Sequence, residues 1–239
     1  MITEERAACL GMLQERMGYH FHDISLLNRA LIHKSYAHEI GRPDDNYERL
    51  EFLGDAVLDL IVSDYLYTTY PASQEGRLSK LRSKIVSESG LTTLANHLQL
   101  GQFLLLGRGE EQTGGRRKTS LLSAAFEAVV AALYLDSDLP VVQNVFLRTF
   151  TSLIEQRLTS SYSRDYKGRL QAYALGHYGC LPSYDIVREE GPAHQKIFYV
   201  QLSLDRRFCC VGVGRSKKAA EQHAAKQLLQ QLSGDASSP

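Results

Sequence analysis

The sequence has little of several residue types, and each scarcity narrows the class of protein it can encode. It contains four cysteines, with no Cys-x-x-Cys pair and no spacing typical of a disulfide framework. No apolar run approaches the roughly 20 residues that a helix needs to cross a bilayer. The first residues include acids and no apolar stretch, which argues against a secretory signal. We therefore expect a cytoplasmic protein with reduced thiols.

An excess of charge of one sign is also absent, because the formal net charge of the 239 residues is zero. The two parts of the chain differ, however. Residues 1–159 hold 16 Lys and Arg against 20 Asp and Glu, whereas residues 160–239 hold 11 against 7. An acidic front and a basic back predict two domains with different functions.

The front of the chain shows helical periodicity and almost no strand pattern before residue 180. We expect helices at Ile24–Ile32, Leu50–Leu66, Leu78–Ile85, Gly90–Leu98 and Leu121–Leu135.

The pattern changes after a short polar stretch near residue 160. Apolar residues alternate with polar ones from Phe198 to Leu204, a period of two that predicts a strand. Together with its neighbours this gives the order helix, three strands, helix, typical of a small α+β layer. The expected elements are Asp165–Tyr178, Ser183–Arg188, Phe198–Leu204, Phe208–Val213 and Ser216–Leu232.

One predicted helix carries an unusual set of acids. Glu48, Glu51, Asp55 and Asp59 fall within an arc of roughly 80° on a helix. A solvated face is the ordinary explanation, but apolar residues cover most of the other faces, so the helix should be largely buried. Clustered carboxylates on such a helix repel one another, and the usual compensation is a bound divalent cation such as Mg²⁺, so the spacing predicts a metal site. Asp59 is the weakest member and fits a solvated position.

The same stretch, Glu48–Ala56 (ERLEFLGDA), resembles the signature of the ribonuclease III family. The resemblance covers essentially the whole chain. It implies a multidomain protein: an all-α endonuclease domain over residues 1–159, a linker over 160–164, a double-stranded RNA-binding domain over 165–233 and a disordered tail over 234–239. Other stretches that agree are Leu31–Tyr36, Glu75-Gly76 with Leu78-Ser79, and Phe126–Ala128 with Leu133–Asp136.

The resemblance implies a homodimeric, Mg²⁺-dependent endonuclease that cuts double-stranded RNA, with Mn²⁺ able to replace Mg²⁺. Such enzymes leave a 5′-phosphate and a 3′-hydroxyl and process ribosomal, messenger and other structured RNA precursors. Glu51, Asp55 and Glu127 match metal ligands of the family. Glu75 matches a carboxylate near the scissile phosphate, and Glu48 an acid that supports the site.

Phe52 lies between two of these ligands. In the family, the aromatic residue at this position fills a socket on the partner subunit. The alternative is an ordinary core phenylalanine.

The sequence departs from the family at one ligand. The family has an Asp three residues before the second-helix Glu, and here that position is Ala124, while Ser123 lies about 100° away around the helix. Three explanations stay open: water replaces the carboxylate in a weaker site, the chain is an engineered inactive variant, or it is a natural member with lost or altered cleavage. The alternative function is therefore a non-catalytic, dimeric double-stranded RNA-binding protein that retains the nuclease fold.

The back domain carries the RNA-binding residues that the resemblance implies. Ser216, Lys217 and Lys218 open a helix whose N-terminus attracts phosphate. Gln171 and His194 match positions that face an RNA groove. Such domains recognise the A-form shape, 2′-hydroxyls and phosphates. In the front domain, the run Arg116-Arg117-Lys118 either touches phosphate or forms a solvated loop.

Overall fold

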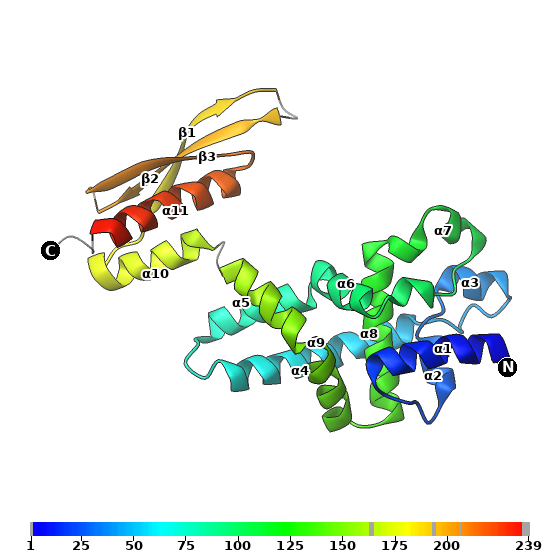
Figure 1. Cartoon of the computed structure of the whole chain (residues 1–239). Coiled ribbons are helices and arrows are strands. Elements are labelled where there is room, and N and C mark those ends of the chain that lie inside the picture. Colours follow the sequence, from blue (N-terminus) through cyan, green and yellow to red (C-terminus); the bar gives the residue numbers. More distant parts are fainter. Residues whose placement is uncertain (1, 163–164, 193–194, 206, 236–239) are drawn as a thin grey trace. The chain divides into compact units, whose positions relative to one another are not determined.

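The computed structural model describes residues 2–162, 165–192, 195–205 and 207–235 (Figure 1). The chain divides into two compact units, Met1–Leu158 and Thr159–Pro239. Helices build the first unit, whereas the second combines helices with a three-stranded sheet. The expected fold class, an all-α domain followed by an α-β-β-β-α domain, is confirmed.

The first unit contains the helices expected from the sequence and several that were not predicted. Its elements are α1 (Glu4–Met17), α2 (Ile24–Arg29), α3 (Lys34–Glu39), α4 (Glu48–Thr69), α5 (Glu75–Val86), α6 (Glu88–His97), η1 (Leu100–Gln102), α7 (Arg108–Gln112), η2 (Gly115–Arg117), α8 (Thr119–Asp136) and most of α9 (Leu139–Tyr162), which continues past Leu158. The helices α1, α3, α7 and α9 were not predicted. Because residues 160–162 belong to α9, the first part of the expected linker is helical, and no glycine or proline interrupts it.

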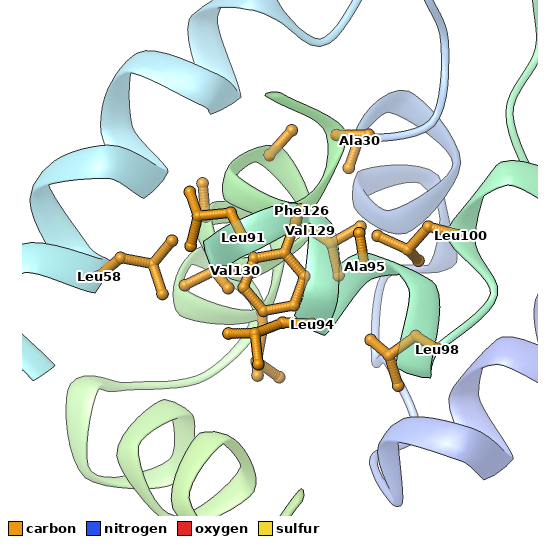
Figure 2. Close-up of a cluster of buried hydrophobic side chains, with 14 of the residues drawn as sticks. Ala30, Leu58, Leu91, Leu94, Ala95, Leu98, Leu100, Phe126, Val129 and Val130 are labelled. Atoms are coloured by element: carbon orange, nitrogen blue, oxygen red, sulfur yellow. The ribbon is translucent and has the colours of Figure 1, made fainter. Parts of the chain in front are cut away.

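The core of this unit is organised around α8. Figure 2 shows Phe126 of α8 surrounded by apolar side chains of α4, α6 and the residues that follow α6. Within the described residues, α8 is also the one helix long and apolar enough to cross a membrane, but most of it is buried in the unit, as expected for a core helix. The labelled neighbours of Phe126 are Ala30, Leu58, Leu91, Leu94, Ala95, Leu98, Leu100, Val129 and Val130.

A buried carboxylate ties the end of α8 to the segment between α1 and α2. Asp136 accepts hydrogen bonds from the backbone N–H groups of His22 (2.8 Å) and Asp23 (2.7 Å) and from the Tyr19 hydroxyl (2.8 Å). Burial alone would raise the pKa of this carboxyl, but these hydrogen bonds lower it overall. The ionised side chain therefore fixes where α8 ends.

The second unit is a sheet covered on one face by two helices. The strands β1 (Ser183–Glu190), β2 (Ile197–Leu204) and β3 (Phe208–Gly214) pair antiparallel in the order β1-β2-β3. The helices α10 (Tyr166–Tyr178) and α11 (Lys217–Asp235) pack on the sheet through Leu170, Leu202 and Leu228. Because α11 runs to Asp235, residues 234–235 of the expected tail are helical.

Candidate functional site

The helices α4 and α8 approach most closely where α4 carries a glycine. A Cβ atom placed on Gly54 would lie 1.9 Å from the carbonyl oxygen of Glu127, which is closer than any real Cβ contact. The absence of a side chain at residue 54 therefore lets the backbone of Glu127 lie against α4. Glu51 is one turn before Gly54, and Asp55 follows it directly. The crossing brings together the segments that bear the three predicted ligands.

The electrostatics of the crossing reflect this proximity. The pKa of Glu127 is raised to about 7, chiefly by burial and then by the negative charges of Asp55 and Glu51. Burial also raises the pKa of Glu51, and the charges of Glu48 and Asp55 act in the same direction. Carboxylate oxygens from two crossing helices, whose negative charges raise one another's pKa, form a donor set that suits a hard divalent cation.

The three carboxylates are close but not gathered into a ready coordination sphere. Across the described ranges, no three or more His, Cys, Asp or Glu side chains stand in position to hold a metal ion. Asp55 is exposed, whereas Glu51 and Glu127 are partly buried. Their side chains must therefore turn toward one another to share an ion.

Neither Ala124, at the position where the family has a fourth carboxylate ligand, nor its neighbour Ser123 carries a charge. Ala124 is 8% exposed and lies one turn before Glu127 on α8, so its methyl group shares a face with Glu127. Ser123 is 9% exposed and points about 100° away from that face.

Two other acids of α4 pair with cations. Glu48 lies in the first turn, and its Oε1 atom is 3.0 Å from the Nζ atom of Lys34. Asp59 lies 3.9 Å from the Arg82 guanidinium. Asp59 is thus half-exposed and paired, as the solvated alternative requires.

Glu75 is not brought to the crossing within one chain. It begins α5, accepts a hydrogen bond from the Ser79 hydroxyl (2.7 Å) and lines a cavity of about 480 Å³. None of Glu51, Asp55 and Glu127 lines this cavity. Its α4 residues run from Leu60 to Tyr67, about 14–24 Å beyond Glu51 at 1.5 Å per residue.

Phe52 does not belong to the core of the chain. Its side chain is 83% exposed, so the alternative of an ordinary core phenylalanine is wrong for the single chain. Leu60 and Tyr67 are also exposed and lie with Phe52 within an arc of about 80° on α4. We call Phe52, Leu60 and Tyr67 the α4 apolar stripe; Leu60 and Tyr67 line the cavity that contains Glu75.

The run Arg116-Arg117-Lys118 mainly holds its own loop together. Arg116 donates to the carbonyl oxygens of Gly101 and Leu104, both at 2.9 Å. Lys118 pairs with Glu110 at 3.2 Å. Arg116 is thus tied to its loop while its side chain stays 39% exposed, and Arg117 is exposed. Contact of this run with phosphate stays a prediction.

In the second unit, the predicted lysines lie at the start of α11. The Ser216 hydroxyl accepts a hydrogen bond from the backbone N–H of Ala219 (3.1 Å), and Lys217 and Lys218 are exposed in the first turn. Gln171 is partly buried on α10. His194 lies outside the described residues.

Two functional features were missed from the sequence. Gly54 had a signal, because a glycine inside an apolar helix indicates a close backbone approach. Lys34 had no such signal in the sequence, because its pairing with Glu48 depends on the course of the loop between α3 and α4.

Comparisons with known proteins agree with this architecture. Residues 23–154 match the family described as Ribonuclease-III-like, and residues 166–232 match the double-stranded RNA binding motif. The chain is 44% identical to the ribonuclease 3 of Borreliella afzelii over 230 residues, which cover 96% of this chain and 94% of that protein. It is 43% identical to the ribonuclease 3 of Pseudothermotoga lettingae over 238 residues, covering 98% of this chain and all of that protein.

A solved structure of the ribonuclease III nuclease domain from Campylobacter jejuni is 42% identical, with a TM-score of 0.56. It covers 59% of this chain, which in turn covers 95% of that domain, and its description refers to a region involved in dimer formation. The chain therefore belongs to the ribonuclease III family, the hydrolases that cut double-stranded RNA.

Proposed function

We propose that the chain hydrolyses double-stranded RNA with a divalent ion, Mg²⁺ or in its place Mn²⁺, held by Glu51, Asp55 and Glu127. The observation that carries this proposal is the crossing at Gly54, where the backbone of Glu127 lies against α4. Besides burial, the charges of Asp55 and Glu51 raise the pKa of the Glu127 carboxyl there. When bound, the ion supplies a reactive water near neutral pH and stabilises charge on the phosphate in the transition state.

The residues of the chain have separate roles in holding the ion. Glu51, Asp55 and Glu127 provide anionic oxygens from two rigid helices. Glu48 supports the first turn of α4 from its pair with Lys34. Ala124 leaves one position of the ion's coordination sphere to water, because a methyl group cannot bind a metal ion. The products carry a 5′-phosphate and a 3′-hydroxyl, as in the family.

One observation favours the alternative of a non-catalytic RNA-binding dimer. The missing carboxylate at residue 124 weakens the donor set, and across the part of the chain that the structure describes the remaining acids do not converge. The two functions differ in one measurement, the cleavage of a duplex RNA by this chain in Mg²⁺.

The metal site is tested on the free protein by titrating Mn²⁺ and following the free ion by electron paramagnetic resonance. Glu127→Gln keeps the size of the side chain and removes its charge, so we expect about tenfold weaker binding. Glu15→Gln, an exposed acid of α1, is the control and should leave binding unchanged. Equal affinity of Glu127→Gln and the unmodified chain would reject this ligand set.

We propose that the α4 apolar stripe forms the centre of a homodimer interface. The large exposure of Phe52, Leu60 and Tyr67, and the dimer-forming nuclease domain of the C. jejuni relative, support this proposal. In a two-fold interface, the partner's Phe52 would enter the 480 Å³ cavity beside Leu60 and Tyr67, and the exchange would be reciprocal.

This arrangement would also explain Glu75. Because Glu75 lines that cavity and Phe52 lies between Glu51 and Asp55 in the sequence, the dimer would bring Glu75 next to the carboxylates of the other subunit. A carboxylate that stands apart in one chain would thereby approach the scissile phosphate in the pair.

Phe52→Ala is expected to weaken the dimer by about 2 kcal/mol, the loss typical of an aromatic residue at an interface centre. The stability of the single chain should hardly change, because Phe52 is exposed there. Sedimentation equilibrium measures the dimer constant, with Met12→Ala, an exposed apolar residue of α1, as the control. A monomeric unmodified chain at micromolar concentration would contradict the proposal.

For the second unit, we propose recognition of A-form RNA by residues 165–233. Ser216, Lys217 and Lys218 would meet phosphates at the start of α11, and Gln171 and His194 would face the groove. The capped helix start with two exposed lysines supports this assignment. We propose a cytoplasmic location for the enzyme.

A further inference from the structure

The backbone at Lys34 is fixed beside the acidic end of α4. The imidazole of His33 caps α3 by accepting from the backbone N–H of Ser35 at 3.3 Å. The backbone of His33 donates to Leu105 (3.0 Å), and the backbone of Tyr47 donates to Ile32 (3.0 Å). These contacts join the start of α3 to the start of α4, so the position of Lys34 is set by the fold.

The charge of Lys34 acts directly on the carboxylates. Its Nζ atom lies 3.0 Å from Glu48, and Glu48 and Glu51 are three residues apart on one helix. The pKa of Lys34 is raised by its hydrogen bond to Glu48, by the charge of Glu48 and by that of Glu51. Lys34 in turn opposes the effects that raise the pKa of Glu51.

The location of this cation has two opposite consequences. The side chain is 58% exposed, so the ammonium group faces solvent as well as Glu48. A phosphodiester that approaches the carboxylates meets their negative charge, and a nearby cation reduces that repulsion. The same cation repels a divalent ion from the same carboxylates.

We propose that Lys34 is a positioning residue that holds Glu48 and lowers the negative potential at the rim where the scissile phosphate approaches. The inference rests on the proposed ligand set of Glu51, Asp55 and Glu127. Lys34 therefore has two effects. It weakens the binding of the divalent ion somewhat, and it reduces the repulsion of the RNA backbone.

The metal half of the proposal is tested by Mn²⁺ titration of the full chain. Lys34→Gln is expected to tighten Mn²⁺ binding about threefold at low ionic strength, with a smaller gain as salt is added. Lys34→Arg should behave as the unmodified chain. The matched control is Lys118→Gln, because Lys118 is 54% exposed and lies 3.2 Å from Glu110, yet should not alter Mn²⁺ affinity.

A double substitution separates charge from geometry. Lys34→Gln combined with Glu48→Gln removes a positive and a negative charge that lie 3.0 Å apart, so Mn²⁺ affinity should return close to that of the unmodified chain. If Lys34 only supports the fold, Lys34→Gln should weaken Mn²⁺ binding or leave it unchanged, and either result overturns the proposal.

The RNA half is tested by binding of a duplex RNA to the full chain in saturating Ca²⁺. Lys34→Gln should weaken binding about twofold to threefold at low ionic strength and make its salt dependence shallower, because one positive charge beside the RNA path is lost. An unchanged affinity and slope would remove Lys34 from the path of the phosphate. Failure of the ligand set itself is distinguishable, since Glu127→Gln would then leave Mn²⁺ affinity unaltered.

Discussion

Ala124→Asp is expected to raise the initial rate of RNA cleavage about tenfold to hundredfold at limiting Mg²⁺. Residue 124 shares a face of α8 with Glu127, so the new carboxylate would join the proposed ligands. One more anionic oxygen in place of water should tighten the binding of a hard cation. The gain should shrink at saturating Mg²⁺ if the defect is in binding alone, and persist if the reactive water is also misplaced.

The burial of residue 124 adds a second signature. Its side chain is only 8% exposed, so a carboxylate there loses hydration and should destabilise the metal-free chain. Bound Mg²⁺ should recover that loss, since a ligand that binds only the folded state stabilises it. The melting temperature of Ala124→Asp should therefore fall in a chelator and rise in Mg²⁺ by more than that of the unmodified chain.

Ser123→Asp is the matched control for this experiment. It adds the same charge at a similarly buried position, but about 100° away around α8. Cleavage rates against Mg²⁺ concentration should show a gain for Ala124→Asp and none for Ser123→Asp. No gain from Ala124→Asp at any Mg²⁺ concentration would mean that α8 does not present residue 124 to the metal.

Gly54→Ala is expected to destabilise the folded chain by about 3 kcal/mol or more. The added Cβ would lie 1.9 Å from the carbonyl oxygen of Glu127 and 2.4 Å from its carbonyl carbon. Both atoms are backbone, so a side-chain rotation cannot relieve the overlap, and the two helices must separate in a packed core. Urea denaturation, followed by circular dichroism, measures the loss.

Gly11→Ala gives the control, because a Cβ on Gly11 of α1 meets nothing within 4 Å. That variant should be neutral or slightly more stable, since alanine favours a helix over glycine by up to about 1 kcal/mol. A loss below about 1 kcal/mol for Gly54→Ala would show that the crossing tolerates separation. A separated crossing should also move Glu127 and weaken Mn²⁺ binding even where the chain still folds.

The acidic helix shows what the sequence could predict. Four acids on a mostly apolar helix led to the prediction of a metal site, because burial and mutual repulsion are properties of the helix itself, and that site stays a prediction. The helix α9 was not predicted, although Val142, Phe146 and Phe150 recur at helical spacing. The local signal for α9 is therefore present in the sequence.

Other parts of the site depend on how separate segments meet. The pairing of Lys34 with Glu48 follows from the loop that returns from α3 to α4, and the distance of Glu75 from Glu51 follows from the direction of α5. Neither the course of that loop nor the direction of α5 can be predicted from a local sequence pattern. The exposure of Phe52 is not encoded locally either, since its neighbours in the sequence are those of a buried helix.

The buried carboxylate of Asp136 limits the order in which the chain can fold during its synthesis. Its donors Tyr19 and Asp23 precede it by 117 and 113 residues. At about 5–20 residues per second, a ribosome reaches codon 136 roughly 6–23 s after those donors are made. During that interval the segment between α1 and α2 lacks the acceptor that holds it in the finished protein. The nascent nuclease unit therefore cannot close its first helices onto α8 until nearly all of that unit has been translated.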